Sequence, residues 1–168
     1  MLDLDAEAIY RTLAARTREM YAGASLRLVG VHTGGVWLAE RLRKELHVDA
    51  PVGILDVSFY RDDFDRSGLK PDVRPSQIAF DVAGSHILLV DDVLYTCRTV
   101  RAAMNEIFDY GRPDRIDLAV LVDRGGRELP VAATLVGATL EVPPDIAVVL
   151  TRGDDQRLHL RMEKRGGE

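Results

Sequence analysis

The sequence has a single cysteine, no excess of positive charge and no long apolar run. One cysteine, Cys97, excludes an internal disulfide and is typical of a reducing compartment, so we expect a cytoplasmic protein. No stretch approaches the ~18 to 20 apolar residues of a membrane span, and the acidic first residues do not resemble a signal peptide. We therefore expect no membrane partner. The net charge of −5 and the pI near 5.4 argue against a basic nucleic-acid-binding surface covering the whole chain.

The chain does have enough apolar material for one core. Of its 168 residues, 46 % are hydrophobic, which predicts a globular fold. Neither an internal repeat nor a linker divides the sequence, so we expect residues 1–168 to form a single domain.

The pattern of apolar residues predicts alternating strands and helices. Helical spacing is present over residues 5–21, after Gly35, and most clearly from Val100 to Phe108. Strands are expected at 26–31, 51–60, 86–91 and 116–122, with strand-like pieces near 131–137, 146–150 and 157–162. This alternation predicts an α/β fold with a mostly parallel central sheet flanked by helices. The charged segment 61–79 has no period and is expected to be a long functional or mobile loop.

Acidic and anion-binding groups lie side by side in the segment LLVDDVLYTCRTVRAAM, residues 88–104. Asp91 and Asp92 end an apolar strand, and the turn from Thr96 to Thr99 leads into a helix N-terminus, where an anion is favoured. The carboxylates would repel a phosphate, so they must serve neutral hydroxyls, a cation or both. A sugar phosphate with a shared divalent metal fits these requirements. An N-capped helix after a strand that carries exposed acids is the alternative interpretation.

The segment ILLVDDVLYTCRT resembles the phosphoribosyl pyrophosphate (PRPP) signature of type I phosphoribosyltransferases. GVHTGGVWLAERL, DVSFYRDD and FDYGRPDRIDLAVLVDRGGRELP further resemble the bacterial pyrimidine operon regulators with uracil phosphoribosyltransferase activity, the PyrR family. The similarity runs from about residue 5 to residue 140. It implies the type I fold, with a small hood and a flexible active-site loop, and the conversion of uracil and PRPP to UMP and pyrophosphate with Mg²⁺.

The resemblance also implies roles for residues near Asp91 and Asp92. These two acids match the catalytic carboxylates that hold the ribose hydroxyls, and with them the metal. Residues Tyr95, Thr96, Cys97, Arg98 and Thr99 match the 5′-phosphate loop. Purine enzymes of this fold often carry a third acid at the position of Tyr95, so its absence favours a pyrimidine base.

Other positions match the pyrophosphate and base sites. Thr33, Gly34 and Gly35 match the pyrophosphate loop, with Gly34 where many relatives carry arginine. Arg61 stands at the hinge of the flexible loop. Asp123 and Val136 match residues near the base, with Val136 in the hood, although core packing is an alternative for Val136. A dinucleotide-binding turn with Asp56 as the ribose acid is an alternative for the segment GVHTGG.

The resemblance also implies regulation of pyrimidine genes. Relatives that attenuate transcription bind leader mRNA across a homodimer and respond to UMP or UTP. Arg157, His159 and Arg161 would line one face of a strand and could bind RNA phosphates, or form a charged edge that discourages aggregation. Two other functions stay open at this point: a catalytically weak, nucleotide-sensing RNA-binding regulator, and a receiver-like signalling domain.

Cys97 departs from the signature, which has glycine at this position. If the backbone there needs a positive φ, a cysteine costs of order 1 kcal/mol. Three interpretations remain: a tolerated substitution, a weakened phosphate site, or an oxidisable thiol beside a helix N-terminus.

Overall fold

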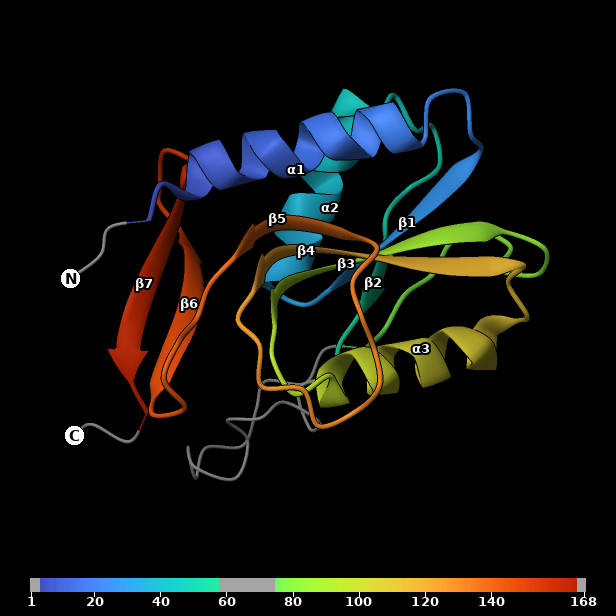
Figure 1. Ribbon diagram of the computed structural model, residues 1–168. Coiled ribbons are helices and arrows are strands. Elements are labelled where there is room, and N and C mark those ends of the chain that lie inside the picture. The colour runs from blue at the N-terminus through green and yellow to red at the C-terminus, as the bar shows by residue number, and fades with distance from the viewer. Residues whose placement is uncertain (1–3, 58–74, 166–168) are drawn as a thin grey trace.

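The computed structural model describes residues 4–57 and 75–165 (Figure 1). Five strands form a parallel sheet in the order β2-β1-β3-β4-β5. Their bounds are β1 Leu26–Val31, β2 Gly53–Leu55, β3 His86–Leu94, β4 Arg115–Asp123 and β5 Leu135–Thr139. The mostly parallel sheet predicted from the sequence is confirmed. In a parallel sheet the loops that follow the strands all leave from one edge, and this edge is where ligands bind.

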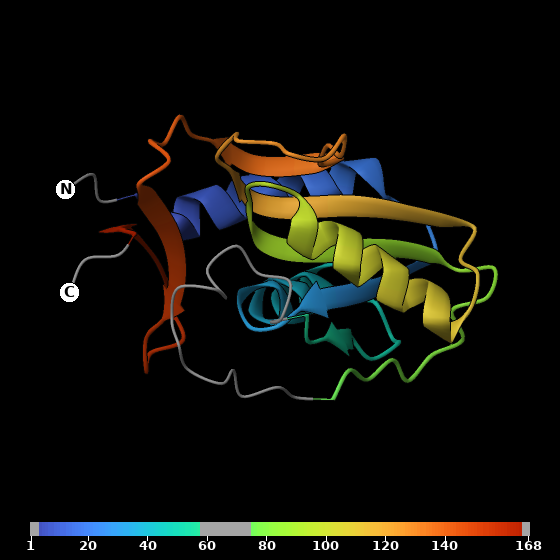
Figure 2. The ribbon, with the colours of Figure 1, turned by 90° about the horizontal axis from the view of Figure 1, so that it is seen from below.

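Helices cover both faces of the sheet. The helices α1, Ala6–Met20, and α2, Gly34–Glu45, pack on one face, and α3, Arg98–Tyr110, packs on the other (Figures 1 and 2). Two apolar clusters follow from this arrangement. One joins Leu13 of α1 and Leu38 of α2 to the sheet, and the other joins Ile107 of α3 to it. No helix in the described ranges is long and apolar enough to cross a membrane.

The helix boundaries follow local sequence signals. Asp5 caps α1, because its Oδ1 accepts a hydrogen bond from the backbone N–H of Ala8 at 2.9 Å. Gly111, with φ of 150°, ends α3. Val100, Ala103 and Ile107 are buried as their spacing predicts, but Phe108 is 55 % exposed. The apolar stripe of α3 is therefore narrower than its sequence indicates.

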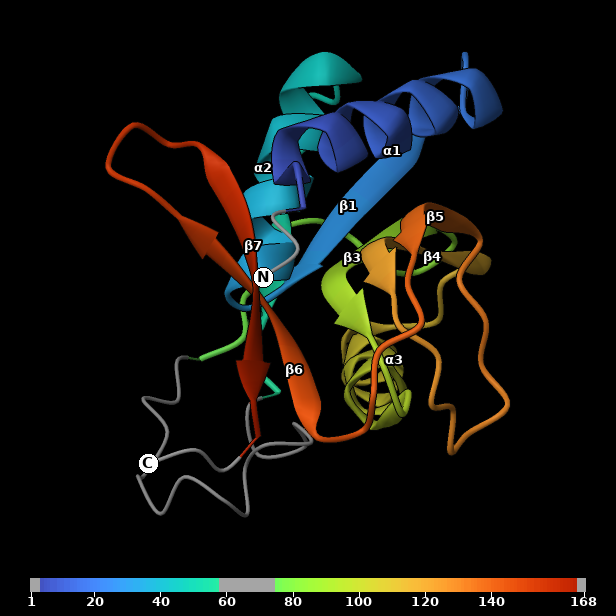
Figure 3. The ribbon, with the colours of Figure 1, turned by 60° about the vertical axis from the view of Figure 1, so that its left-hand side comes forward.

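The C-terminal part of the described chain forms a separate two-stranded antiparallel sheet. Strands β6, Ile146–Arg152, and β7, Leu158–Lys164, make a hairpin that stands beyond the carboxyl ends of the central strands (Figure 3). Along β7, buried Leu158 and Leu160 alternate with exposed His159 and Arg161, as predicted. We refer to residues 146–164 as the hood hairpin.

Three expectations need correction or fall outside the described residues. Within its described part, residues 51–57, the strand expected at 51–60 is present as β2, and residues 58–60 lie outside the described residues. The piece expected at 131–137 begins four residues later, as β5. The structure places Val136 in β5 of the central sheet, whereas β6 and β7 form a separate two-stranded sheet. Most of the expected loop 61–79, including Arg61, lies outside the described residues.

A buried carboxylate connects three elements at the opposite, amino end of the sheet. Asp117 is 5 % exposed and accepts hydrogen bonds from Tyr21 Oη at 2.8 Å, His86 Nε2 at 2.8 Å and Arg115 Nε at 2.9 Å. Burial by itself raises the pKa of Asp117, but the bonds from His86, Tyr21 and Arg115 outweigh burial, so the pKa is lowered. The ionised form of Asp117 therefore stabilises the fold.

We predict that Asp117→Asn lowers the free energy of unfolding by about 2 to 3 kcal/mol, because it leaves buried donors without an ionised acceptor. Urea denaturation at neutral pH measures this loss. Because the folded-state pKa is lowered, the contribution is complete above the ordinary pKa of 3.8 and disappears as the pH falls through the folded-state value. The two proteins should thus converge in acid. Asp114→Asn, at an exposed neighbouring position, is the matched control. An equal loss in both variants would contradict the role of Asp117.

Candidate active site

Two carboxylates stand at the carboxyl end of β3. Asp91 is buried, at 6 % exposure, and Asp92 is partly exposed. The backbone N–H of Asp92 donates to Asp91 Oδ1 at 2.9 Å, and that of Val93 donates to Asp92 Oδ1 at 2.8 Å. These bonds fix both side chains against their own strand. Such fixed acceptors suit the hydroxyls of a sugar.

The loop after β1 packs directly against these acids. It comprises residues 32–35, and α2 begins within it at Gly34. A Cβ on Gly34 would overlap the carboxylate of Asp92, and one on Gly35 would overlap the carbonyl oxygen of Val90. Glycine at position 35 is thus required for the backbone to approach β3, whereas Gly34 leaves room for the side chain of Asp92. Position 34 carries no guanidinium here, so the N-terminus of α2 offers backbone N–H groups in its place.

Residues 95–99 form the turn that leads from β3 into the N-terminus of α3. Cys97 precedes α3 with φ of 75° and ψ of 5°, the left-handed conformation. Thr96 Oγ1 accepts a hydrogen bond from the backbone N–H of Arg98 at 3.3 Å. Asp91 and Asp92 consequently lie between the N-termini of α2 and α3, each favourable for an anion. Among the described residues, the structure brings together those predicted for the ribose and the 5′-phosphate with Thr33, Gly34 and Gly35 of the pyrophosphate set; Arg61 of that set lies outside the described residues.

The segment after β4 packs against the turn at residues 95–99. The backbone N–H groups of Glu128 and Leu129 donate to the carbonyl oxygen of Thr96 at 3.1 and 3.3 Å. Arg98 Nε donates to Glu128 Oε2 at 2.7 Å, with both side chains about half exposed. The positive charge predicted for phosphate at Arg98 is therefore shared with Glu128.

Asp123, predicted near the base, is paired with Arg127. The guanidinium of Arg127 makes a bidentate contact with the carboxylate, and the backbone N–H of Gly125 donates to Asp123 Oδ1 at 3.0 Å. The bond from Arg127 outweighs burial and lowers the pKa of Asp123. Arg127 Nε also donates to the carbonyl oxygen of Val131 at 3.0 Å. This pair holds the segment after β4 in a tight turn, a role that the sequence analysis did not assign to Arg127.

Tyr95 lies between two guanidinium groups. The Arg124 guanidinium stands 4.1 Å from the ring centroid, and that of Arg165 stands 4.4 Å from it. Arg124 is buried at 4 % exposure and donates to the carbonyl oxygens of Pro143 at 3.0 Å and Ile146 at 2.5 Å. The end of β4, the phosphate loop and the hood hairpin are thereby joined. Sequence reasoning missed this link, because its members are up to 70 residues apart.

The remaining predicted residues lie away from Asp91 and Asp92, or occupy a different position in their strand from the one expected. Val136 pairs with Val120 in the sheet and packs in the apolar cluster on the α3 face. This corresponds to the core-packing alternative. On the hood hairpin, His159 and Arg161 are exposed on β7, whereas Arg157 precedes the strand, so the three do not form one strand face.

The dihedral angles of Cys97 generate a stability prediction. Its side chain is 2 % exposed, and Sγ lies 3.5 Å from the carbonyl oxygen of Val131, so burial makes the thiol poorly accessible to oxidants. At a positive φ, Cβ costs roughly 1 to 2 kcal/mol, which glycine avoids. We predict that Cys97→Gly is about 1 kcal/mol more stable than Cys97→Ala, the reverse of the usual order in ordinary backbone. Urea denaturation measures the difference, and alanine being the more stable would contradict it.

Comparisons with known proteins agree with this geometry. A family model described as the phosphoribosyl transferase domain matches residues 3–152. The bifunctional protein PyrR of Nitrosococcus oceani is 51 % identical over 158 residues, covering 91 % of this chain and 89 % of that protein. The PyrR of Pseudomonas syringae is 52 % identical over 135 residues, covering 80 % and 79 %.

Solved structures show the same fold at greater distance. The hypoxanthine phosphoribosyltransferase of Trypanosoma cruzi has a TM-score of 0.67 at 24 % identity and covers 96 % of this chain and 94 % of that one. The hypoxanthine phosphoribosyltransferase of Staphylococcus aureus has a TM-score of 0.64 at 21 % identity, with coverage of 88 % and 80 %. Through its sequence and its fold, the chain belongs to the phosphoribosyltransferases and, within them, to the family of bifunctional PyrR proteins.

Proposed function

We propose that the protein transfers the phosphoribosyl group of PRPP to uracil, giving UMP and pyrophosphate. The observation that carries this proposal is the position of Asp91 and Asp92 between the N-termini of α2 and α3. PRPP has a phosphate at one end of its ribose and a pyrophosphate at the other, and the three features match these three parts in order. The family assignment supports a phosphoribosyl substrate, and it argues against both the dinucleotide and the receiver-like alternatives.

Each part of the site then has a distinct role. The turn at residues 95–99 holds the 5′-phosphate, and Thr33, Gly34 and Gly35 hold the departing pyrophosphate through backbone N–H groups. Asp91 and Asp92 accept hydrogen bonds from the ribose hydroxyls and stabilise the positive charge that develops on the ring as the bond at C1 breaks. Displacement at C1 needs this positioning and charge compensation more than it needs a nucleophile of the protein.

Magnesium fits the donor set of the site. No group of three or more His, Cys, Asp or Glu side chains gathers among residues 4–57 and 75–165, so a metal cage made of protein alone is absent there. Mg²⁺ commonly uses one or two carboxylates together with substrate phosphates. Asp91 and Asp92 are the residues that would hold it, and the ion would neutralise charge on the leaving pyrophosphate.

A pyrimidine is the proposed base because no carboxylate occupies position 95. The Tyr95 ring is held between Arg124 and Arg165, which leaves an aromatic and cationic wall at this position. The solved relatives named as hypoxanthine enzymes share the fold alone. Asp123 remains the proposed contact for the base region and acts through its pair with Arg127, whereas Val136 packs in the apolar cluster on the α3 face.

Regulation of pyrimidine genes is the second proposed function, supported by the curated relatives that bear the name bifunctional protein PyrR. In this proposal, the protein binds leader mRNA through His159 and Arg161 and responds to UMP or UTP. It acts as a homodimer in the cytoplasm. The exposure of His159 and Arg161 on β7 supports such a contact. Arg157 would reach RNA only from the preceding turn.

We predict that the protein forms UMP from uracil and PRPP in the presence of Mg²⁺, and forms much less nucleotide from hypoxanthine. Chromatography of the products measures both rates. Asp91→Asn and Asp92→Asn should each lower kcat on the order of 100-fold, because each removes charge stabilisation in the transition state. Asp109→Asn, at an exposed position of α3, should leave the rate unchanged.

The outcomes separate the two functions. Turnover of uracil that depends on both acids supports the transferase. Binding of PRPP or UMP without any turnover would contradict it and favour the catalytically weak, nucleotide-sensing regulator. A preference for hypoxanthine would overturn the assignment of the base.

A further inference from the structure

A second cavity lies outside the candidate active site, where α1, α2 and the turn of the hood hairpin meet. Its volume is about 490 Å³, within the range of small-molecule sites. The lining residues are mostly charged: Glu7, Arg11, Trp37, Glu40, Arg41, Lys44, Arg152, Asp155, Gln156 and Arg157. Five are basic and three are acidic, so the cavity carries a net charge of +2 in a chain of net charge −5. This reversal of sign marks the cavity as a place for an anion.

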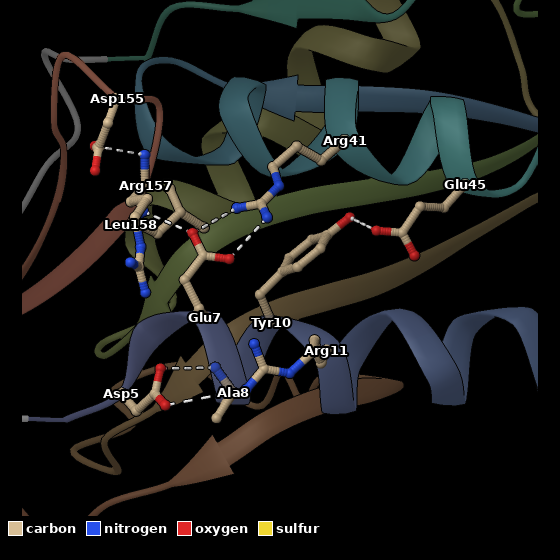
Figure 4. Close-up of polar contacts among 10 residues, drawn as sticks. All are labelled: Asp5, Glu7, Ala8, Tyr10, Arg11, Arg41, Glu45, Asp155, Arg157 and Leu158. Carbon is tan, nitrogen blue, oxygen red and sulfur yellow. Dashed lines mark hydrogen bonds and ion pairs between the residues drawn. The ribbon is translucent and has the colours of Figure 1, made fainter.

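The acid at the centre of this cavity is already neutralised. Both carboxylate oxygens of Glu7 accept hydrogen bonds from Arg41, at 3.0 and 2.8 Å, and the backbone N–H of Leu158 donates to Oε1 at 2.8 Å (Figure 4). The bond from Arg41 holds the pKa of Glu7 below its usual range, and the charge of Arg157 adds to this. Glu7 of α1 thus connects α2 and the hairpin to its own helix. Because its charge is balanced by Arg41, it does not neutralise the other cations of the cavity.

The two remaining acids are also directed to local partners. Glu40 lies 4.0 Å from Arg43, one helical turn along α2 and outside the cavity lining. Asp155 Oδ1 accepts a hydrogen bond from the backbone N–H of Arg157 at 3.0 Å, within the turn of the hairpin (Figure 4). Both acids stay charged, but once Glu7 is paired with Arg41 the four other cations of the lining still outnumber these two acids.

The cations come from three separate elements and are partly held in place. Arg41 stacks on the Tyr10 ring at 4.1 Å, and Arg152 stacks on the Trp37 ring at 4.7 Å. Arg11 from α1, Lys44 from α2 and Arg157 from the hairpin are exposed around them. The Arg11 guanidinium lies 4.0 Å from Asp5, and both of these side chains are exposed (Figure 4). Cations arranged on several sides of a concave site suit a ligand with several negative charges better than a single carboxylate.

We propose that this cavity is a binding site for a small polyphosphate, either free or as part of a nucleotide. Its bound phosphates would contact Arg11, Lys44 and Arg157 and would join the hood hairpin to α2. The inference does not depend on the proposed transferase activity, because none of these three residues belongs to the loops assigned to PRPP.

Trp37 makes the test specific, because it is the only tryptophan in the sequence and lines the cavity. We expect inorganic tripolyphosphate to change its fluorescence saturably, with an affinity that falls as salt rises. The double variant Arg11→Gln, Lys44→Gln should weaken binding by at least about tenfold, since it removes two charge-assisted contacts. The control Arg27→Gln, Arg112→Gln removes the same charge elsewhere and should bind as the parent does. Melting temperatures confirm that both variants fold.

Each outcome decides the proposal. Trp37 also lies two residues after Gly35, so binding at the pyrophosphate loop could alter its fluorescence; such a signal would persist unchanged in the Arg11, Lys44 variant and would overturn the proposal. No saturable change would overturn it as well. Tighter binding of ATP than of tripolyphosphate, lost in the same variant, would support it and identify a nucleotide. The protein could instead bind a single-stranded oligoribonucleotide, with this binding lost in the Arg11, Lys44 variant, but bind neither tripolyphosphate nor ATP. That result would overturn the proposal and identify the cavity as a nucleic-acid contact.

Discussion

The parallel pairing of β1 with β3 is the constraint on which the site depends. Its register aligns Gly30 with Val90, so β1 ends at Val31, level with Asp91, while β3 continues to Leu94. The loop after β1 therefore leaves beside the two acids and passes against the backbone of β3. Gly35 allows this approach, because a Cβ there would overlap the carbonyl oxygen of Val90, and Gly34 lies against the side chain of Asp92. Without that close approach, the N-termini of α2 and α3 would not flank the same pair of carboxylates.

A second constraint is the way in which the segments around the site are tied to one another. Arg124 bonds to backbone carbonyl oxygens of the hood hairpin and stacks on Tyr95, and Thr96 accepts two hydrogen bonds from residues after β4. Few of these contacts involve groups that would touch a substrate. They fix the relative positions of the groups that do, which is how binding energy is used for orientation in catalysis.

The sequence was sufficient for features that local patterns encode. The period of α3, the apolar run of β3 and the two acids at its end are contiguous in the chain, and each was located correctly. The roles of Arg124, Arg127 and Arg165 were not predicted, because their partners are brought near only by the fold. The pairing of Val136 with Val120 in the central sheet was not predicted for a related reason: a strand pattern does not specify its partner strand. Likewise, no pattern gives the dihedral angles of Cys97.

The hydrogen-bonded Asp117 has a consequence for how this chain can vary. Asp117 pairs in register with Leu88, three residues before Asp91, which corresponds to roughly 10 Å along a strand. Free-energy effects at that separation, with no shared partners, usually add independently. Substitutions in the ligand-facing loops can therefore accumulate without changing the contribution of Asp117 to the free energy of unfolding. In a family that combines two functions on one fold, such a division lets one end of the sheet diversify without loss of the folded state.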